Sequence, residues 1–152
     1  MMGKPKIKCV LLAERHSGLS EGIRGLLETE FEAVVMVANS ASLFEAAERL
    51  QPAIAVVELS LSRDAGFDLL RQMRARFPDL KIIALSMHKE PAMVRMAIDA
   101  GANGYVLKSC LATDLLQAVD ALLSGKQYVS PSIDSPSPDS TGKNSSSENN
   151  AI

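Results

Sequence analysis

The stretch AIAVVEL, residues 53–59, is an apolar run that carries a carboxylate, Glu58, near its end. Four further runs are equally short and are also rich in Val, Ile and Leu: residues 7–13, 33–38, 81–86 and 104–108. Short, nearly continuous apolar runs are typical of strands buried on both faces of a sheet. A carboxylate at the end of such a strand either belongs to a binding or reactive site or is simply solvated, and the other strand ends help to decide between these possibilities.

Helical patterns lie between the apolar runs. Leu19, Ile23 and Leu26 fall on one helical face, and similar stripes separate the later runs and follow the last one. Pro78 stops the third helical pattern, and Gly125 closes the last one. Strand and helix thus alternate five times, which predicts an α/β domain with a parallel sheet covered by helices on both faces.

Polar side chains stand where the predicted strands end. In doubly wound sheets, ligands bind at the carboxyl ends of the strands, near the point where the strand order reverses. The residues at these ends are Glu14, Arg15 and His16 after the first run, Glu58 in the third, Ser86 in the fourth and Lys108 in the fifth. Their convergence on one edge of an apolar sheet favours a site over separate solvated side chains.

Composition bounds the classes of function. The chain has 152 residues, is 47% hydrophobic and 22% charged, and carries a net charge of −2. This near-balance of charge argues against a nucleic-acid binder with a basic face. No apolar run approaches ~20 residues, so we expect no membrane span. The N-terminal apolar run is too short for a signal peptide, and the expected location is cytoplasmic.

Residues 130–152 differ from the rest of the chain. They are rich in Ser, Pro, Asn and Asp and nearly lack apolar residues. Such a segment cannot bury enough apolar surface to offset the entropy of ordering. We therefore expect a folded domain at residues 1–129 and a disordered tail at residues 130–152.

Four motifs carry a resemblance to a known family: LLAERH (11–16), ALSMH (84–88), AGANGYVLK (100–108) and LLSGKQYVSP (122–131). In this order and spacing, they resemble the receiver domain of two-component response regulators, the CheY-like fold, and within it the NarL/FixJ type. The resemblance covers about residues 6–125. It implies a (βα)5 doubly wound, five-stranded parallel sheet with strand order 2-1-3-4-5, as in CheY and flavodoxin.

The resemblance also implies roles for residues of the site. In that family, two acids after the first strand and an Asp at the end of the third bind Mg²⁺, and this Asp accepts a phosphoryl group from a histidine kinase. Here Glu14 matches the first acid, Arg15 stands at the second, and Glu58 stands at the phosphoacceptor. Gly66 matches the glycine that closes the acceptor loop.

Three further positions match groups that respond to the phosphoryl group. Ser86 matches the hydroxyl and Lys108 the lysine that contact phosphoryl oxygens, and Tyr105 matches an aromatic residue that rotates with activation. Tyr105 has a plainer alternative, in which it packs with its hydroxyl in water.

Two of the three acidic positions have changed, which alters the expected chemistry. The formal charges of Glu14, Arg15, Glu58 and Lys108 sum to zero. Arginine has only donors and cannot ligate a metal, so we expect Arg15 to pair with Glu58, Glu14 or both. Mg²⁺ binding should be weak or absent, with no cofactor and no metal site, because Mg²⁺ needs oxygen ligands in near-octahedral geometry.

Glu58 is one methylene longer than Asp, and phosphoryl transfer depends mainly on positioning and electrostatics. An acylphosphate is therefore not expected at Glu58. The longer side chain could hold Ser86 and Lys108 in part of the activated arrangement, which would make a permanently biased switch. The pocket could equally be degenerate, held by a salt bridge, with no switch left.

Other residues have plain and functional interpretations. Asp64 could be a substitute phosphoacceptor or a cap before the helix that follows Gly66. His16 and His88 are expected to be loop residues rather than metal ligands, on the ground that no cysteine or acid stands at ligand spacing from them.

The last helical stripe is wider than one sheet face requires. It predicts a protein–protein interface, with a homodimer as one form. The residues of this stripe are Leu115, Leu116, Val119, Leu122 and Leu123.

The sequence thus predicts a stand-alone, atypical receiver that is not an enzyme and acts by binding a histidine kinase, a full-length regulator or an output protein, without phosphorylation. No helical pattern follows Pro131, so no helix-turn-helix domain and no direct nucleic-acid or membrane binding are expected. The alternatives are a Mg²⁺-dependent phosphorelay receiver modified on Glu58 or Asp64, and a receiver fragment of a DNA-binding regulator. A nucleotide-binding enzyme is disfavoured, since the chain has neither G-x-G-x-x-G nor a P-loop.

Overall fold

Strands and helices alternate along the chain in the computed structural model, which describes residues 6–61 and 66–133. The strands are β1 (Ile7–Ala13), β2 (Phe31–Val37), β3 (Ile54–Glu58), β4 (Lys81–Ser86), β5 (Gly104–Leu107) and β6 (Tyr128–Val129). The α-helices are α1 (Ser17–Leu27), α2 (Ser40–Leu50), α3 (Phe67–Arg76), α4 (Pro91–Ala100) and α5 (Leu111–Leu123). Two short 3₁₀ helices, η1 (Leu59–Leu61) and η2 (Lys108–Cys110), follow β3 and β5.

The strands form one parallel sheet in the order β2-β1-β3-β4-β5-β6. This confirms the doubly wound α/β fold and the order 2-1-3-4-5, but the predicted number of five strands is one too few. The sixth strand, β6, pairs with β5, with Tyr128 opposite Gly104 and Val129 opposite Tyr105. A two-residue strand leaves no apolar run in the sequence, which is why the pattern does not show it.

The ordered chain continues past the predicted boundary at residue 129. Ser130 is only 1% exposed, and its hydroxyl accepts a hydrogen bond from the Leu107 backbone N–H at 3.0 Å. Ile133 packs against the core. The boundary is therefore wrong by at least four residues, because backbone pairing and not composition holds this segment. The predicted disorder of the remaining tail, residues 134–152, lies outside the described residues.

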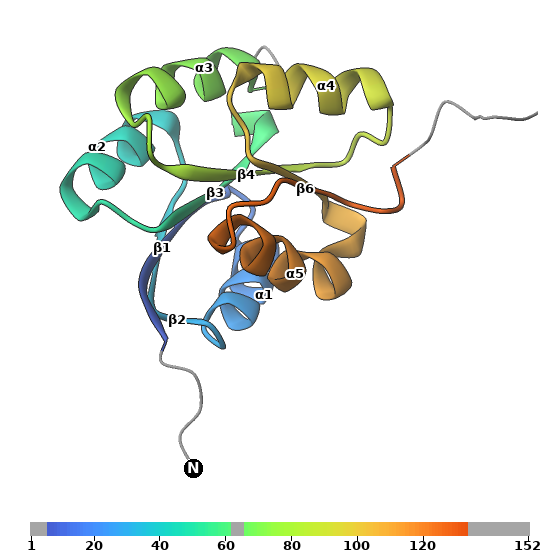
Figure 1. Ribbon diagram of the computed structural model, residues 1–152. Helices are drawn as coiled ribbons and strands as arrows, with labels where there is room; N and C mark the ends of the chain where they lie inside the picture. The colour runs from blue at the N-terminus through green and yellow to red at the C-terminus, as the bar shows by residue number, and fades with distance from the viewer. Residues whose placement is uncertain (1–5, 62–65, 134–152) are drawn as a thin grey trace, which may run out of the picture.

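Helices cover both faces of the sheet, as Figure 1 shows: α2, α3 and α4 lie on one face, and α1 and α5 on the other. Each face has its own apolar core. Leu43, Leu70 and Met73 pack on the first face. Ile23 and Leu115 pack on the second. Every residue of β3 is buried, as expected for a central strand covered on both sides.

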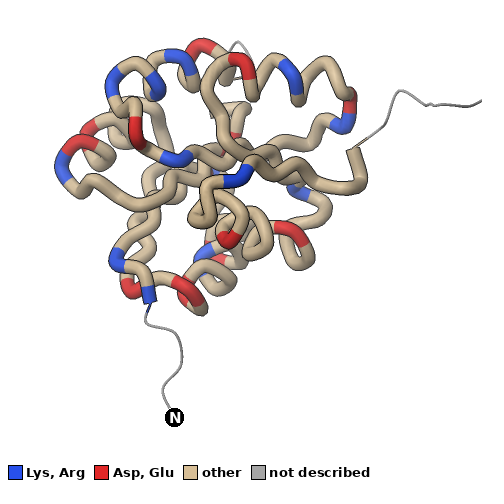
Figure 2. The backbone as a smooth tube through the Cα atoms, in the orientation of Figure 1, with Lys and Arg blue, Asp and Glu red and all other residues tan. Residues whose placement is uncertain are grey.

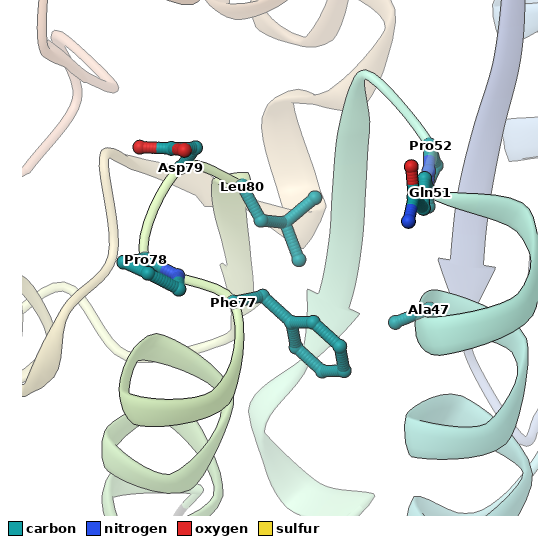
Figure 3. A pocket seen from close by; sticks show the side chains of 7 residues that line it. All are labelled: Ala47, Gln51, Pro52, Phe77, Pro78, Asp79 and Leu80. Atoms are coloured by element: carbon teal, nitrogen blue, oxygen red, sulfur yellow. The ribbon is translucent and has the colours of Figure 1, made fainter.

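The amino ends of the strands carry structural contacts. The guanidinium of Arg74 binds backbone carbonyls in the turns after α3 and α4. A cavity of about 370 Å³ lies between the C-terminal ends of α2 and α3 (Figure 3), lined by Ala47, Gln51, Pro52, Phe77, Pro78, Asp79 and Leu80. Asp79 is the only ionisable residue among those that line it, so the cavity lacks the groups of a catalytic or metal site. The polar residues predicted from the sequence lie at the opposite edge of the sheet.

Charged residues of both signs are interspersed along the described chain (Figure 2), consistent with the small net charge. Among the described helices, none is both long enough and apolar enough to span a bilayer.

Candidate functional site

The carboxyl ends of β1, β3, β4 and β5 bring the predicted polar residues to one edge of the sheet. Glu14 directly follows β1, Glu58 ends β3, Ser86 ends β4 and Lys108 directly follows β5. These strands are neighbours, and β1 also pairs with β2, so the strand order reverses here. The structure therefore assembles these side chains at the position where doubly wound folds bind ligands.

Lys108 is the cation at the centre of this site. Its Nζ lies 3.3 Å from Glu14 Oε1 and 3.5 Å from Glu58 Oε2. The side chain of Lys108 is 11% exposed, whereas those of Glu14 and Glu58 are 0% and 4% exposed. Two buried carboxylates thus share one ammonium group, which lowers the negative charge of the pocket from two to one.

Ser60 fixes the carboxylate of Glu58. Its backbone N–H donates to Glu58 Oε2 at 2.6 Å, and its hydroxyl donates to Oε1 at 2.5 Å. Both oxygens of Glu58 therefore already hold a hydrogen bond from the turn that follows β3. Sequence reasoning missed Ser60, although a serine two residues after a strand-end acid is a common way to satisfy that acid locally.

Arg15 does not make the predicted ion pair with Glu14 or Glu58. It is exposed, and within residues 6–61 and 66–133 its Nη2 makes one long contact, of 3.5 Å, to the Ser60 hydroxyl. The Arg15 guanidinium thus lies beside the residue that caps Glu58 and stays exposed to water, whereas the Lys108 side chain is only 11% exposed. Among the described residues, Lys108 takes the role that was expected of Arg15.

His16 lies against Glu14, contrary to the argument that no acid is at ligand spacing. Its backbone N–H and its Nδ1 are 3.2 and 2.9 Å from Glu14 Oε2. His88 also has an acid nearby, since its Nδ1 is 3.5 Å from Glu90 Oε1. One ligand atom from each of Glu14, His16 and Glu58 can be chosen so that all lie within 4.8 Å of one another. These three are the described residues that could hold a metal.

Ser86 and Tyr105 meet on the loop after β4. The Ser86 hydroxyl accepts a hydrogen bond from the His88 N–H at 3.0 Å, and the Tyr105 hydroxyl donates to the His88 carbonyl at 2.8 Å. Tyr105 is fully buried, so its hydroxyl is not in water as the plainer interpretation held. Burial raises the pKa of this phenol, with a smaller opposing contribution from the Ser86 hydroxyl. The neutral phenol is thus a stable donor to the loop.

The predicted interface stripe on α5 is mostly core. Leu115, Val119 and Leu122 are at most 1% exposed and pack against the sheet, so they cannot contact a partner. Of the stripe, Leu116 is half-buried and Leu123 is 39% exposed. The sheet covers a wider arc of helix α5 than the sequence analysis assumed, so most of the apolar stripe belongs to the core.

Asp64 lies outside the described residues, so neither of its two proposed roles has a structural description.

Comparison with known protein families matches residues 10–120 to the response regulator receiver domain. The chain belongs to this family. The residues of the site, from Glu14 to Lys108, lie within the matched range.

Relatives with assigned names include DegU of Brevibacillus brevis, 29% identical over 130 residues, which cover 84% of this chain and 55% of DegU. RcsB of Escherichia coli strain K12 is 32% identical over 130 residues, covering 82% of this chain and 60% of RcsB. Both are named transcriptional regulatory proteins. The chain spans little more than half the length of these relatives.

Solved structures show the same fold. The isolated receiver domain of RcsB from Salmonella enterica serovar Typhimurium, in the presence of the phosphomimetic BeF₃⁻, has a TM-score of 0.74 at 28% identity and covers 85% of this chain and 96% of that one. A LuxR-family response regulator from Aurantimonas sp. SI85-9A1 has a TM-score of 0.77 at 30% identity, covering 85% of this chain and 93% of that one.

Proposed function

We propose that this receiver acts without phosphorylation, by presenting a fixed surface to other signalling proteins. The observation that carries the proposal is the state of Glu58. Its two oxygens are hydrogen-bonded to Ser60, and Lys108 pairs with it from the side of Glu14. Phosphoryl transfer would require a free, correctly placed oxygen and a charge-neutralising cation, and both requirements are disturbed here.

The residues do not fit Mg²⁺, the cation that the family implies. The position of the second acid holds Arg15, whose side chain is exposed and has no ligand atom. The ammonium of Lys108 stands between the remaining carboxylates of Glu14 and Glu58. Mg²⁺ dehydrates reluctantly and prefers an all-oxygen octahedral shell, which this pocket does not offer.

The loop after β4 supports a fixed rather than a switchable surface. Tyr105 is buried and bound to the His88 carbonyl, and Ser86 is bound to the His88 N–H. The backbone N–H and the backbone carbonyl of His88 are thus both held by hydrogen bonds, which fixes the loop at this residue. Met87, which lies within this loop, is 77% exposed and would be part of the surface offered to a partner. Of the two groups expected to respond to Glu58, only Lys108 contacts it.

The experiment is intact-mass measurement after incubation with Mg²⁺ and a small-molecule phosphodonor. The native protein should stay unmodified. The Arg15→Asp, Glu58→Asp double variant restores the three-carboxylate pattern and should gain one phosphoryl group, since most of the scaffold is in place. A native protein that takes up phosphate to the same extent as the double variant would contradict the proposal and point to a working phosphorelay receiver.

Partner binding is proposed to involve the outer side of α5, and self-association is its simplest form. Leu116 and Leu123 are the members of the stripe that reach the surface. If a homodimer forms there, Leu116→Glu with Leu123→Glu should weaken it by about tenfold or more, because charges would enter an apolar contact. Gln117→Glu, at an exposed position of the same helix, is the control.

Sedimentation equilibrium measures this effect as a change in the dissociation constant. An unchanged association state in the double variant, or an equal change in the control, would count against this surface.

A second candidate function is favoured by the names of the relatives, which are transcriptional regulators of greater length. In this alternative the chain is the receiver part of such a regulator and acts on an output domain. Reading the gene across codon 152 distinguishes this from a stand-alone receiver.

A further inference from the structure

We propose that Ser130 is a positioning residue for the loop after β4, which it holds in place through β5 and Tyr105. Ser130 directly follows β6, in a segment that contains none of the residues predicted for the site. The proposal deepens the proposed function and rests on it in one respect, the use of the loop after β4 as a surface for partners. Its test measures the folded chain by itself, so its outcome does not depend on phosphorylation or on partner binding.

Ser130 binds β5 with both its backbone and its side chain. Its N–H donates to the Tyr105 carbonyl at 2.9 Å, and its hydroxyl accepts from the Leu107 N–H at 3.0 Å. The Ser130 carbonyl is used elsewhere, in a turn, where it accepts from the Ile133 N–H at 3.2 Å. The hydroxyl therefore makes the ladder bond that the carbonyl of a longer β6 would make.

The outer edge of β5 depends on this segment. Among the described residues, β6 is the last strand of the sheet, and it pairs with β5 only at Gly104 and Tyr105. Beyond these pairs, the partner of the Leu107 N–H is the Ser130 hydroxyl, and both residues are at most 1% exposed. A buried N–H without an acceptor is costly, so removal of this hydroxyl should favour local opening at the end of β5.

Tyr105 links β5 to the loop after β4. Its carbonyl accepts the Ser130 N–H, and its own hydroxyl donates to the His88 carbonyl at 2.8 Å. The His88 N–H is bound in turn to Ser86 Oγ at 3.0 Å, and the neighbouring Met87 is 77% exposed. Because hydrogen bonds weaken steeply when their angles depart from the optimum, a loosened β5 should release the loop at His88. The exposed surface of this loop is thus held by buried contacts that begin at Ser130.

The test is amide hydrogen exchange of the full chain, measured residue by residue with NMR. In Ser130→Ala, the Leu107 amide should exchange about tenfold or more faster than in the native protein, because it loses its acceptor. The His88 amide, which is bound to Ser86 and not to Ser130, should exchange about threefold or more faster. The Ser42 amide is the internal reference, because it is also bound to a side-chain oxygen, Asn39 Oδ1, at 2.8 Å, and it should keep its native rate.

Tyr105→Phe tests the route from β5 to the loop. This substitution keeps the buried ring and removes the hydroxyl that binds the His88 carbonyl, so the His88 amide should exchange faster in this variant. Adding Ser130→Ala should then change the His88 rate by less than about twofold, because the link is already absent. If Ser130→Ala accelerates His88 equally with and without the Tyr105 hydroxyl, the proposed route is wrong.

Tyr128→Phe is the matched control on β6. The Tyr128 hydroxyl is buried without a hydrogen-bond partner in the described part of the chain, so its removal deletes a polar group of the same strand and leaves β5 paired. Ser20→Ala is a second control, since the Ser20 hydroxyl is part-buried and donates to the Ser17 carbonyl within α1 at 2.9 Å. Neither control should change the exchange rate of the His88 amide.

The proposal is overturned if the His88 amide of Ser130→Ala exchanges as in the native protein. It is also overturned if the Ser42 amide accelerates equally, which would show general loosening, or if Tyr128→Phe accelerates His88 to the same extent. Uptake of a phosphoryl group by the native chain would contradict the proposed function but would leave these exchange rates, and the role of Ser130, unaffected.

Discussion

Replacing Arg74 with methionine is expected to lower the free energy of unfolding by about 4 kcal/mol, since several partly buried acceptors lose their donor at once. Its Nη1 donates to the Leu80 carbonyl at 2.7 Å and to the Phe77 carbonyl at 3.2 Å. Its Nη2 donates to the Gly101 carbonyl and to Asn103 Oδ1, both at 2.7 Å. One side chain thus joins the turn after α3 to the turn after α4.

Gly101 shows how closely this contact is packed. Its φ of +126° is a conformation that L side chains rarely adopt, and a Cβ placed there would lie 2.7 Å from Arg74 Cβ. Methionine keeps the aliphatic stem of Arg74 but not its donors, so the variant isolates the hydrogen bonds. Urea unfolding measures the loss, with an unchanged slope showing that the folded state stays compact.

Arg49→Met is the control for Arg74. Arg49 is 66% exposed and makes one helical ion pair with Glu45 at 3.7 Å. Surface pairs of this kind contribute roughly 0.5 kcal/mol or less. Equal effects of the two substitutions would contradict the structural role given to Arg74.

Replacing Lys108 with methionine is expected to cost about 3 kcal/mol, because two buried carboxylates lose their shared counter-charge. Glu14 and Glu58 would then repel one another at a site that is 0% and 4% exposed. Adding Glu14→Gln to the variant removes one of the two negative charges. This second substitution should therefore recover part of the lost stability in the Lys108→Met background and should destabilise the native protein.

Glu14→Gln is thus expected to change the free energy of unfolding in opposite directions in the two backgrounds. The four proteins form a double-mutant cycle, which measures the coupling between Glu14 and Lys108. Lys126→Met, at an exposed position after α5, is the control for removing a lysine. If the free energy of unfolding of Lys108→Met equals that of the native protein within error, Lys108 does not serve as the counter-charge of the two carboxylates.

The strands of the parallel sheet could be predicted from the sequence because each central strand is an almost unbroken apolar run, whereas their order was implied by the resemblance to receivers. β3 is the clearest case, with all five residues buried. The short strand β6 could not be predicted in this way, because backbone bonds such as Ser130 N–H to the Tyr105 carbonyl at 2.9 Å define it. Such bonds leave no trace in side-chain chemistry.

The sequence allowed us to predict which residues gather at the site, but not which of them form ion pairs. Glu14, Glu58 and Lys108 meet because parallel strands end at one edge of the sheet. The choice of Lys108 over Arg15 depends on which cation is buried between the carboxylates, which the order of residues alone does not state. Ser60 was missed for a similar reason, since its role depends on the turn that η1 forms after β3.

With Arg15 in place of the second acid, and with Lys108 paired to Glu14 and Glu58, the pocket is expected not to take up the Mg²⁺ that phosphorylation needs. A Mg²⁺ titration followed by NMR of the backbone amides tests it most directly. In the native protein, the amides of Glu14, Ser60 and Lys108 should show no saturable shift at millimolar Mg²⁺, whereas the same amides of the Arg15→Asp, Glu58→Asp variant should shift and saturate. Saturable shifts of these amides in the native protein would contradict the claim.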